Sequence, residues 1–251
     1  MKSISCNAMK LAIESNVKSE ALNQLIKTEN IVVVKNYLEL TQVNSIIKYL
    51  TSHISNTVPA YAPITHHSEN FYRTNFEDPR AFIKGHFHQI NFFPWNEDNF
   101  NFYSLFQNIF NLKNSLNRSD QEKFLNGKDK DFVPKISFQF YDSGAGFLER
   151  HTDPVGEHQS VVPILAMSSK GSDFDTGGLE VMANKEWIIV DDYVEPGDLI
   201  LIRGDLPHGV RRIDPEKKFD LLSTGRWMGL FAINKVEGSN KAANSQSVMK
   251  N

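Results

Sequence analysis

The second half of the chain decides the fold, because it is a series of short β-type runs separated by turn residues. In order, these runs are KISFQFYD (135–142), VVPILAMS (161–168), GLEVMA (178–183), EWIIVDDYV (186–194), DLILIRG (198–204), HGVRRI (208–213) and LLSTGRWMGLFAI (221–233). Between them, GSDFDTGG (171–178) and EPGD (195–198) supply the Gly, Pro and Asp that tight reversals need. Closely spaced short strands of this kind predict an antiparallel sandwich or barrel.

The first half of the chain predicts flanking helices instead. Apolar residues recur there with the 3.6-residue period of a helix in three segments, whose expected caps are Ser19, Thr41, and Asp98 or Asn99. Between the first two segments, IVVVKNYL (31–38) predicts a buried strand, whereas residues 52–85 have no clear period and predict long loops. The expected fold class is therefore mainly β with flanking α.

Length and composition are those of a single globular domain. The chain has 251 residues, of which 40% are hydrophobic and 23% charged, and a β-rich fold of this size commonly forms one domain. We expect one domain over residues 1–235 with its β core at about 134–233. The polar tail, residues 236–251, has no period and is predicted to be disordered.

Several classes of protein are disfavoured by the composition. With 27 Lys and Arg against 30 Asp and Glu, the chain lacks the concentrated positive charge of a nucleic-acid binder. Its single cysteine, Cys6, excludes an intramolecular disulfide and a multi-cysteine zinc cluster, and makes the cytosol the default compartment. Because no run approaches about 18 consecutive apolar residues, we expect no segment that crosses a membrane. The oligomeric state is left open.

The motif RHTDPV (150–155) places a histidine and an aspartate two positions apart at the end of a predicted strand. In a strand, residues i and i+2 point to the same face, so His151 and Asp153 can present an imidazole and a carboxylate to one point. A third ligand, His208, follows a later strand, and His-x-Asp with a distant His is the composition of the facial triad that binds Fe(II). The alternatives are a polar corner at His151 and a turn histidine at His208.

One arginine of the last predicted strand suits a co-substrate with two carboxylates. A guanidinium can hold a carboxylate by two parallel charge-assisted hydrogen bonds, and Arg226 lies among apolar residues where an unpaired charge is costly. We therefore expect an anion beside Arg226. The alternative candidate for this role is Arg212, four residues after His208. Its sequence context is more typical of a strand end exposed to solvent.

These elements together resemble the Fe(II)/2-oxoglutarate-dependent dioxygenase family. The resemblance rests on FQFYDSGAGFLERHTD, KGSDFDTGGLEV, EPGDLILIRGDLPHGV and the strand of Arg226, which together span about residues 134–233. It implies a double-stranded β-helix core of the jelly-roll or cupin-like type, braced by N-terminal helices. It also implies Fe(II) as the metal, with 2-oxoglutarate and O2 as co-substrates.

Carried over by position, the resemblance assigns roles to individual residues. His151, Asp153 and His208 are the implied iron ligands, Arg226 holds the distal carboxylate of 2-oxoglutarate, and Tyr141 lies near the co-substrate or serves as a packing ring. The prolyl-hydroxylase-like branch uses a lysine in place of the arginine, and this chain has no suitable one. The family's reaction converts 2-oxoglutarate into succinate and carbon dioxide while a bound substrate is oxidised, and an aspartate at 153 favours hydroxylation over halogenation.

The substrate is less defined by the sequence than the metal site. We expect its contacts to come from the N-terminal half and from loops, and the candidates are His66, His67, Arg73, His86, His88, and the pair Arg150 and His158 that flanks the motif. His86 and His88 could also form a second metal site. The leading hypothesis is hydroxylation of a small molecule such as a free amino acid or specialised metabolite. A protein or peptide hydroxylase, a zinc hydrolase or non-catalytic barrel, and a nucleic-acid demethylase remain as alternatives.

Overall fold

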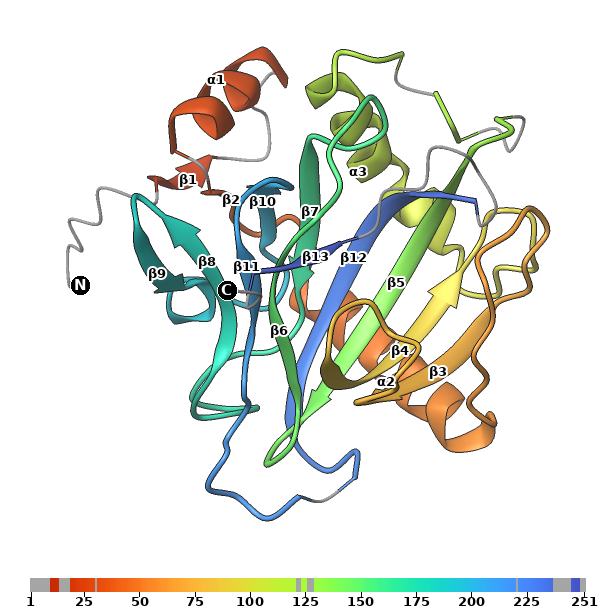
Figure 1. Ribbon diagram of the computed structural model, residues 1–251, viewed down its shortest axis with the longest axis vertical. Helices are drawn as coiled ribbons and strands as arrows, with labels where there is room; N and C mark the ends of the chain where they lie inside the picture. Colours follow the sequence, from red (N-terminus) through yellow and green to blue (C-terminus); the bar gives the residue numbers. More distant parts are fainter. Residues whose placement is uncertain are drawn as a thin grey trace.

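The computed structural model describes residues 10–13, 19–29, 31–120, 123–125, 129–219, 221–236 and 245–248 (Figure 1). It contains three α-helices, α1 (Ser19–Glu29), α2 (Leu40–Asn56) and α3 (Phe102–Leu116). The strands of the first half are β1 (Lys10–Ile13), β2 (Ile31–Val34), β3 (Phe71–Phe76) and β4 (Gly85–Phe92). Those of the second half are β5 (Phe132–Asp142), β6 (Phe147–Thr152), β7 (Val161–Ala166), β8 (Gly178–Ala183), β9 (Glu186–Ile189), β10 (Leu199–Arg203), β11 (His208–Arg211), β12 (Gly225–Lys235) and β13 (Gln246–Ser247), with a 3-10 turn η1 (Val190–Asp192) before β10.

All the described strands belong to one curled sheet. Its order is β1-β2-β10-β7-β12-β5-β4-β6-β11-β8-β9, while β3 pairs with β4 and β13 pairs with β6. Every pair is antiparallel except β1 with β2, which is parallel. The sheet folds over on itself, so that β6, β11, β8 and β9 face the larger part that begins at β4 (Figure 1). This is the half-barrel expected of a jelly-roll core with flanking helices.

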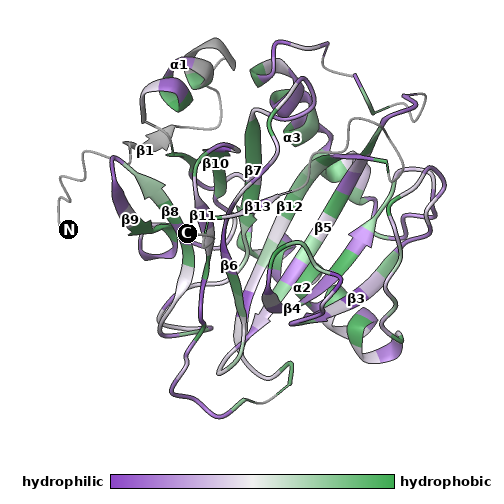
Figure 2. Cartoon of the chain, viewed as in Figure 1, coloured by the Kyte–Doolittle hydropathy of each residue, from purple (hydrophilic) through white to green (hydrophobic). Residues whose placement is uncertain are grey.

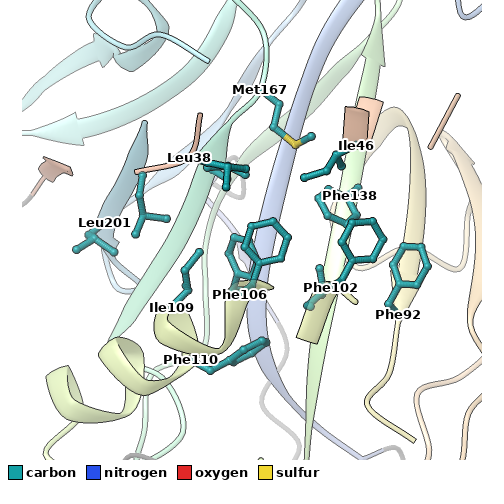
Figure 3. Close-up of a cluster of buried hydrophobic side chains, with 14 of the residues drawn as sticks. Leu38, Ile46, Phe92, Phe102, Phe106, Ile109, Phe110, Phe138, Met167 and Leu201 are labelled. Carbon is teal, nitrogen blue, oxygen red and sulfur yellow. The ribbon is translucent and has the colours of Figure 1, made fainter. Parts of the chain in front are cut away.

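One hydrophobic core lies between the outer face of the larger sheet and helices α2 and α3. Along β5, Ile136, Phe138 and Phe140 alternate with polar residues and point to this core. Figure 3 shows Phe102 and Phe106 of α3 directed toward Phe138. Because burial of one such ring contributes roughly 1.5–3 kcal/mol, the phenylalanines of this core between Phe92 and Phe138 stabilise the packing of helices on the sheet.

A second core fills the interior of the curled sheet. It joins residues of the larger sheet, such as Ile164 and Ile200, to Leu179 and Val181 of β8 on the facing side. Figure 2 shows the hydrophobic residues concentrated in strands such as β7 and β10, with hydrophilic ones in the connecting loops. Since both faces of these central strands are buried, their sequences are continuous apolar runs and not alternating ones.

The three expected helices are present, and several differences from the sequence predictions concern the first half of the chain. The strand expected at 31–38 ends at Val34, because Asn36 takes a positive φ of 53° in a turn. The stretch predicted as loops contains β3, which pairs with β4 over its whole length. The expected caps Thr41 and Asp98 or Asn99 are wrong, since Glu39 caps α2 and Asn101 caps α3. Asp98 Oδ2 nevertheless accepts the backbone N–H of Tyr103 in the first turn of α3 at 2.9 Å.

The polar tail also contains a short ordered stretch. Gln246 and Ser247 form β13, which pairs with Thr152 and His151 of β6, and the backbone N–H of Val248 donates to Arg150 O at 3.0 Å. The expectation of disorder therefore does not apply to residues 245–248, and the rest of the tail beyond Val236 lies outside the described residues. The limits of the domain, 1–235, stay a prediction. Among the described helices, none is long and apolar enough to cross a membrane.

We predict that Lys113 makes stability depend on pH. This lysine of α3 is fully buried and donates to Gln159 Oε1 at 3.0 Å and to Val161 O at 2.8 Å. Burial lowers its pKa from an ordinary value near 10.5 to about 7. Between those two values the unfolded chain binds more protons than the folded one, so the free energy of unfolding should rise with pH.

The test compares urea unfolding of the wild type and Lys113→Met between pH 7.5 and pH 9.5. The wild-type free energy of unfolding should rise more steeply, by up to about 1.4 kcal/mol per pH unit, because the variant lacks the titrating amine. Lys48→Met, an exposed lysine of α2, is the control and should follow the wild type. Parallel pH profiles for wild type and Lys113→Met would show that this amine keeps its charge when buried.

Candidate metal centre

The two histidines of the predicted triad lie directly opposite each other. His151 is near the end of β6, His208 begins β11, and the antiparallel register of the two strands pairs these residues. Their ring centroids are 4.3 Å apart at an angle of 53° between planes. The pairing explains how residues 57 positions apart in sequence meet at one point.

Each imidazole is held by the same backbone contact. The Nδ1 atom of His151 lies 2.8 Å from Glu149 O, and that of His208 lies 2.8 Å from Leu206 O. A carbonyl only accepts hydrogen bonds, so each Nδ1 carries the proton and each Nε2 keeps its lone pair. The hydrogen bond to a carbonyl also fixes the ring orientation, as is typical of metal-binding histidines.

The carboxylate of Asp153 lies between the two free nitrogens. Asp153 Oδ1 is 3.8 Å from His151 Nε2, and Oδ2 is 3.6 Å from His208 Nε2. Its backbone N–H donates to Gly204 O at 2.9 Å, which fixes the chain where it leaves β6. Ser245, from the segment of β13, donates its hydroxyl to Asp153 Oδ1 at 2.8 Å.

The three ligand atoms fit one metal ion. One atom from each side chain can be chosen so that all lie within 4.8 Å of one another, and this is the one such group among the described residues. Burial lowers the pKa of His151 to about 4, with the neighbouring His208 acting in the same direction and Asp153 opposing it. His151 is therefore neutral at physiological pH, which metal binding requires. Two imidazoles and one carboxylate on one side match the facial triad of Fe(II) oxygenases.

Arg226 already has a carboxylate partner within the protein. It is almost fully buried at the start of β12 and donates from Nε to Asp191 Oδ2 at 2.7 Å and from Nη2 to Asp191 Oδ1 at 3.1 Å. The sequence predicted an anion beside Arg226, but not that Asp191 of η1 would supply it. The third nitrogen, Nη1, is buried and has no hydrogen-bond partner among the described residues.

Asp191 reaches Arg226 because Gly178 leaves room for it. A Cβ atom added at Gly178 would lie 2.4 Å from Asp191 Oδ2, and the residue has a positive φ of 111°. The same carboxylate accepts the backbone N–H of Leu179. The Gly-Gly pair at 177–178, predicted from the sequence as a turn, thus also shapes the surroundings of Arg226.

Tyr141 lies opposite Arg226 in the pairing of β5 with β12 and is fully buried. Its hydroxyl donates to Gln139 Oε1 at 2.6 Å, and its ring packs against Phe87 with 5.3 Å between centroids. Burial raises the pKa of Tyr141 well above its usual range, so the phenol stays protonated. This position agrees with a packing ring, and the expected place of Tyr141 near the co-substrate stays a prediction.

Other predicted candidates are occupied elsewhere. Arg212, the rival of Arg226, is exposed and donates to Ala145 O at 3.0 Å. Arg150 forms two hydrogen bonds with Glu180, at 2.8 and 3.0 Å, and covers the ring of Trp187. Neither arginine is paired with a member of the triad.

The remaining histidines do not form a second metal site among the described residues. Both nitrogens of His88 are used, by Tyr72 Oη at 2.6 Å and by Asp142 Oδ2 at 2.9 Å. His86 stacks on Phe76. The last three candidates, His66, His67 and His158, contact Lys130 O, Trp95 and Phe132 respectively.

Sequence reasoning missed two contributors to this region. Asp191 was included in a predicted strand, EWIIVDDYV, and its pairing with Arg226 depends on the 3-10 turn that ends this run. Ser245 lies in a polar segment with no periodic signal. The two adjacent aspartates in an otherwise apolar run were the one available sign for Asp191, because a buried carboxylate needs a cationic partner.

Comparisons by sequence give no relative, since no family model and no curated protein matches the chain. Solved structures do match. A prolyl-4-hydroxylase from Pseudomonas putida has a TM-score of 0.54 at 14% identity, covering 86% of this chain and 98% of that one. A prolyl hydroxylase from Trichoplax adhaerens, in complex with a peptide fragment of hypoxia inducible factor, has a TM-score of 0.52 at 11% identity over 86% and 88%.

A third neighbour contains the co-substrate that the sequence resemblance implied. This full-length protein from Neurospora crassa, solved in complex with alpha-KG (2-oxoglutarate), has a TM-score of 0.50 at 10% identity, covering 86% of this chain and 79% of that one. At such low identities these likenesses establish the fold. The expectation of Fe(II) and 2-oxoglutarate is supported by that fold together with the His-Asp-His triad within it. The chain thus has the double-stranded β-helix fold of the Fe(II)/2-oxoglutarate-dependent oxygenases.

Proposed function

We propose that the protein is an Fe(II)- and 2-oxoglutarate-dependent oxygenase that hydroxylates a small molecule, such as a free amino acid or specialised metabolite. The single observation that supports this most is the meeting of His151, Asp153 and His208 at the end of the β6–β11 pair. Bound ferrous iron would couple the oxidation of 2-oxoglutarate by O2 to the oxidation of the substrate. On the evidence of the single cysteine, we further propose a cytosolic location.

In this proposal His151, Asp153 and His208 are the iron ligands. Their orientation is set before the metal binds, because two backbone carbonyls hold the imidazoles and Ser245 holds one oxygen of Asp153. A ligand set that is already ordered loses less conformational entropy on binding the metal. Since all three lie on one side, the ion would keep positions open for a co-substrate and O2.

Arg226 and Tyr141 are the proposed contacts of 2-oxoglutarate. The free Nη1 of Arg226 can donate to the distal carboxylate, while Asp191 keeps the guanidinium oriented through its other two nitrogens. The pairing with Asp191 also reduces the net charge that the co-substrate meets. We therefore expect one donated hydrogen bond to this carboxylate from Arg226, and not the bidentate pair predicted from the sequence.

Hydroxylation of a residue in a protein or peptide is the second candidate. It is favoured by the two prolyl hydroxylases among the structural neighbours, one of which was solved with a peptide. We prefer a small-molecule substrate because the described residues form one curled sheet with its flanking helices and no separate unit for docking a protein. A zinc hydrolase with the same three ligands is a further alternative. The incubation with Fe(II) and 2-oxoglutarate described next distinguishes it from an oxygenase.

The proposed function is tested by incubating the purified protein with Fe(II), 2-oxoglutarate and a metabolite panel in air. Succinate should form in a reaction that depends on iron, and mass spectrometry should find one panel member heavier by one oxygen atom. A peptide library is the parallel arm for the second candidate. If no succinate forms with Fe(II), the proposed function is wrong. Hydrolysis of a panel member with Zn(II) alone would indicate the zinc hydrolase.

The ligand assignment predicts that metal binding is lost when one member of the triad is removed. His208→Ala should weaken Mn(II) or Fe(II) binding by more than about 100-fold, since loss of even an outer-shell partner of a metal ligand costs about 10- to 100-fold. Isothermal titration under nitrogen measures the affinity directly. His67→Ala, which changes an exposed histidine, is the control and should bind metal as the wild type does. Unchanged affinity in His208→Ala would remove this residue from the site.

The assignment of Arg226 predicts a higher requirement for 2-oxoglutarate. Arg226→Ala alone would leave the buried Asp191 unpaired, so the double variant Arg226→Ala/Asp191→Asn is the better test. Loss of one charge-assisted hydrogen bond, about 1.5–3 kcal/mol, should raise the KM for 2-oxoglutarate by about 10- to 100-fold. Arg212→Ala should leave it unchanged. A raised KM in Arg212→Ala, with an unchanged KM in the double variant, would instead assign the binding of 2-oxoglutarate to Arg212.

A further inference from the structure

Strands β3, β4 and β5 present a row of polar side chains to the interior of the curled sheet. Arg73 donates from Nε to Gln89 Oε1 at 2.8 Å, and Gln89 donates from Nε2 to Ser137 Oγ at 2.7 Å. Lys135 precedes Ser137 by two residues on β5 and therefore lies on the same face. This face also contains Tyr141 of the inner core. The row is polar where the rest of the interior is apolar, so packing alone does not explain it.

Two cations in this row form no ion pair with a carboxylate in the described part of the chain. Lys135 is only 6% exposed, and no described residue forms a hydrogen bond or an ion pair with its ammonium group. Arg73 uses Nε for Gln89 and forms no ion pair with a described carboxylate. Burial lowers the pKa of Lys135 to about 7, and the charge of Arg73 adds to this effect. Such a pair is costly in the free protein and would be stabilised by a bound anion.

Lys135 lies at the same end of the curled sheet as the triad. Strands β5 and β7 are both antiparallel to β12, so they run in the same direction, and Lys135 is near the start of β5. Just before the start of β7, Ser160 O accepts the N–H of Gly204 at 3.0 Å, and Gly204 O accepts that of Asp153 at 2.9 Å. The carboxylate of Asp153 also acts on Lys135, whose pKa it raises.

The charges around the triad favour a negatively charged ligand. Arg226 and Asp191 neutralise each other. With a divalent ion on Asp153, the ion, Lys135 and Arg73 carry a positive excess that the two carboxylates of 2-oxoglutarate only partly balance. The buried Lys113, on whose pKa Asp153 also acts, adds to this excess, which a further carboxylate would reduce.

We propose that Lys135 and Arg73 form a binding site for the carboxylate of the substrate, which is therefore a small carboxylic acid of the free amino acid type. The inference rests on the proposed function, because it takes the triad as the reacting centre, and it adds the substrate class. Arg73 was among the substrate candidates from the sequence. Lys135 was not among them, since KISFQFYD predicted only a strand.

The experiment measures binding and requires no turnover. The protein is loaded with Mn(II) in place of Fe(II) and with 2-oxoglutarate under nitrogen, and its melting temperature is recorded with each free L-amino acid and with the matching amide. Inorganic phosphate is the comparison anion. At least one free acid should raise the melting temperature in a concentration-dependent way, while its amide and phosphate should not.

The variants then locate the site. Lys135→Met should weaken binding of that acid by about 10- to 100-fold, as expected for the loss of one charge-assisted hydrogen bond. Lys135→Arg, which keeps the charge, should restore part of the affinity. Lys84→Met is the matched control, because this exposed lysine pairs with Glu77 outside the sheet interior. It should bind the acid as the wild type does.

The results distinguish this inference from the proposed function. If Mn(II) with 2-oxoglutarate does not raise the melting temperature, the proposed function fails first. If they do, the inference is overturned when no free acid binds, when the amide or phosphate binds equally well, or when Lys135→Met binds like the wild type. Retained 2-oxoglutarate binding in Lys135→Met would show that the variant is folded and that the co-substrate site is separate.

Discussion

The structure depends on one strand pairing, the antiparallel contact of β6 with β11 that sets His151 opposite His208. Side chains alternate between the two faces of a strand, so a slip of one residue would turn one histidine away from the other. The bonds from Nδ1 to Glu149 O and Leu206 O then aim both Nε2 atoms at Asp153. Backbone geometry therefore determines the metal site, and the side chains need only be histidine and aspartate at those positions.

The pair of Arg226 and Asp191 shows how a buried charge can be kept while one of its donor groups stays unpaired. Two of the three guanidinium nitrogens are used within the protein, which stabilises the cation in a fully buried position. The third is left without a described partner and is directed by the geometry of the other two. In the proposed co-substrate site, the ligand would therefore not supply the whole counter-charge of this arginine. Arg226 is oriented in the absence of a ligand. Because Asp191 offsets its positive charge, the arginine attracts a further anion less strongly than an unpaired arginine would.

Much of the fold and the whole triad could be predicted from the sequence, because both depend on local signals. Apolar runs between Gly, Pro and Asp predicted the strands of the second half, and the spacing of His151 and Asp153 predicted a shared face. What could not be predicted depends on tertiary contacts. Strand β3 has a mixed sequence that becomes ordered by pairing with β4, and Lys135 was hidden in a run that predicted only a strand. The partner of Arg226 required knowledge of where η1 folds.

Strand β13 adds a constraint of the same non-local kind. Its pairing places Ser247 opposite His151, and the preceding Ser245 donates to Asp153 Oδ1. A hydroxyl on one carboxylate oxygen leaves Oδ2, which lies 3.6 Å from His208 Nε2, as the better placed metal ligand. The same carboxylate also acts on two buried lysines, Lys135 and Lys113, whose pKa values its negative charge raises. Asp153 is therefore the residue through which the C-terminal strand, the metal site and the polar row of β3 to β5 influence one another.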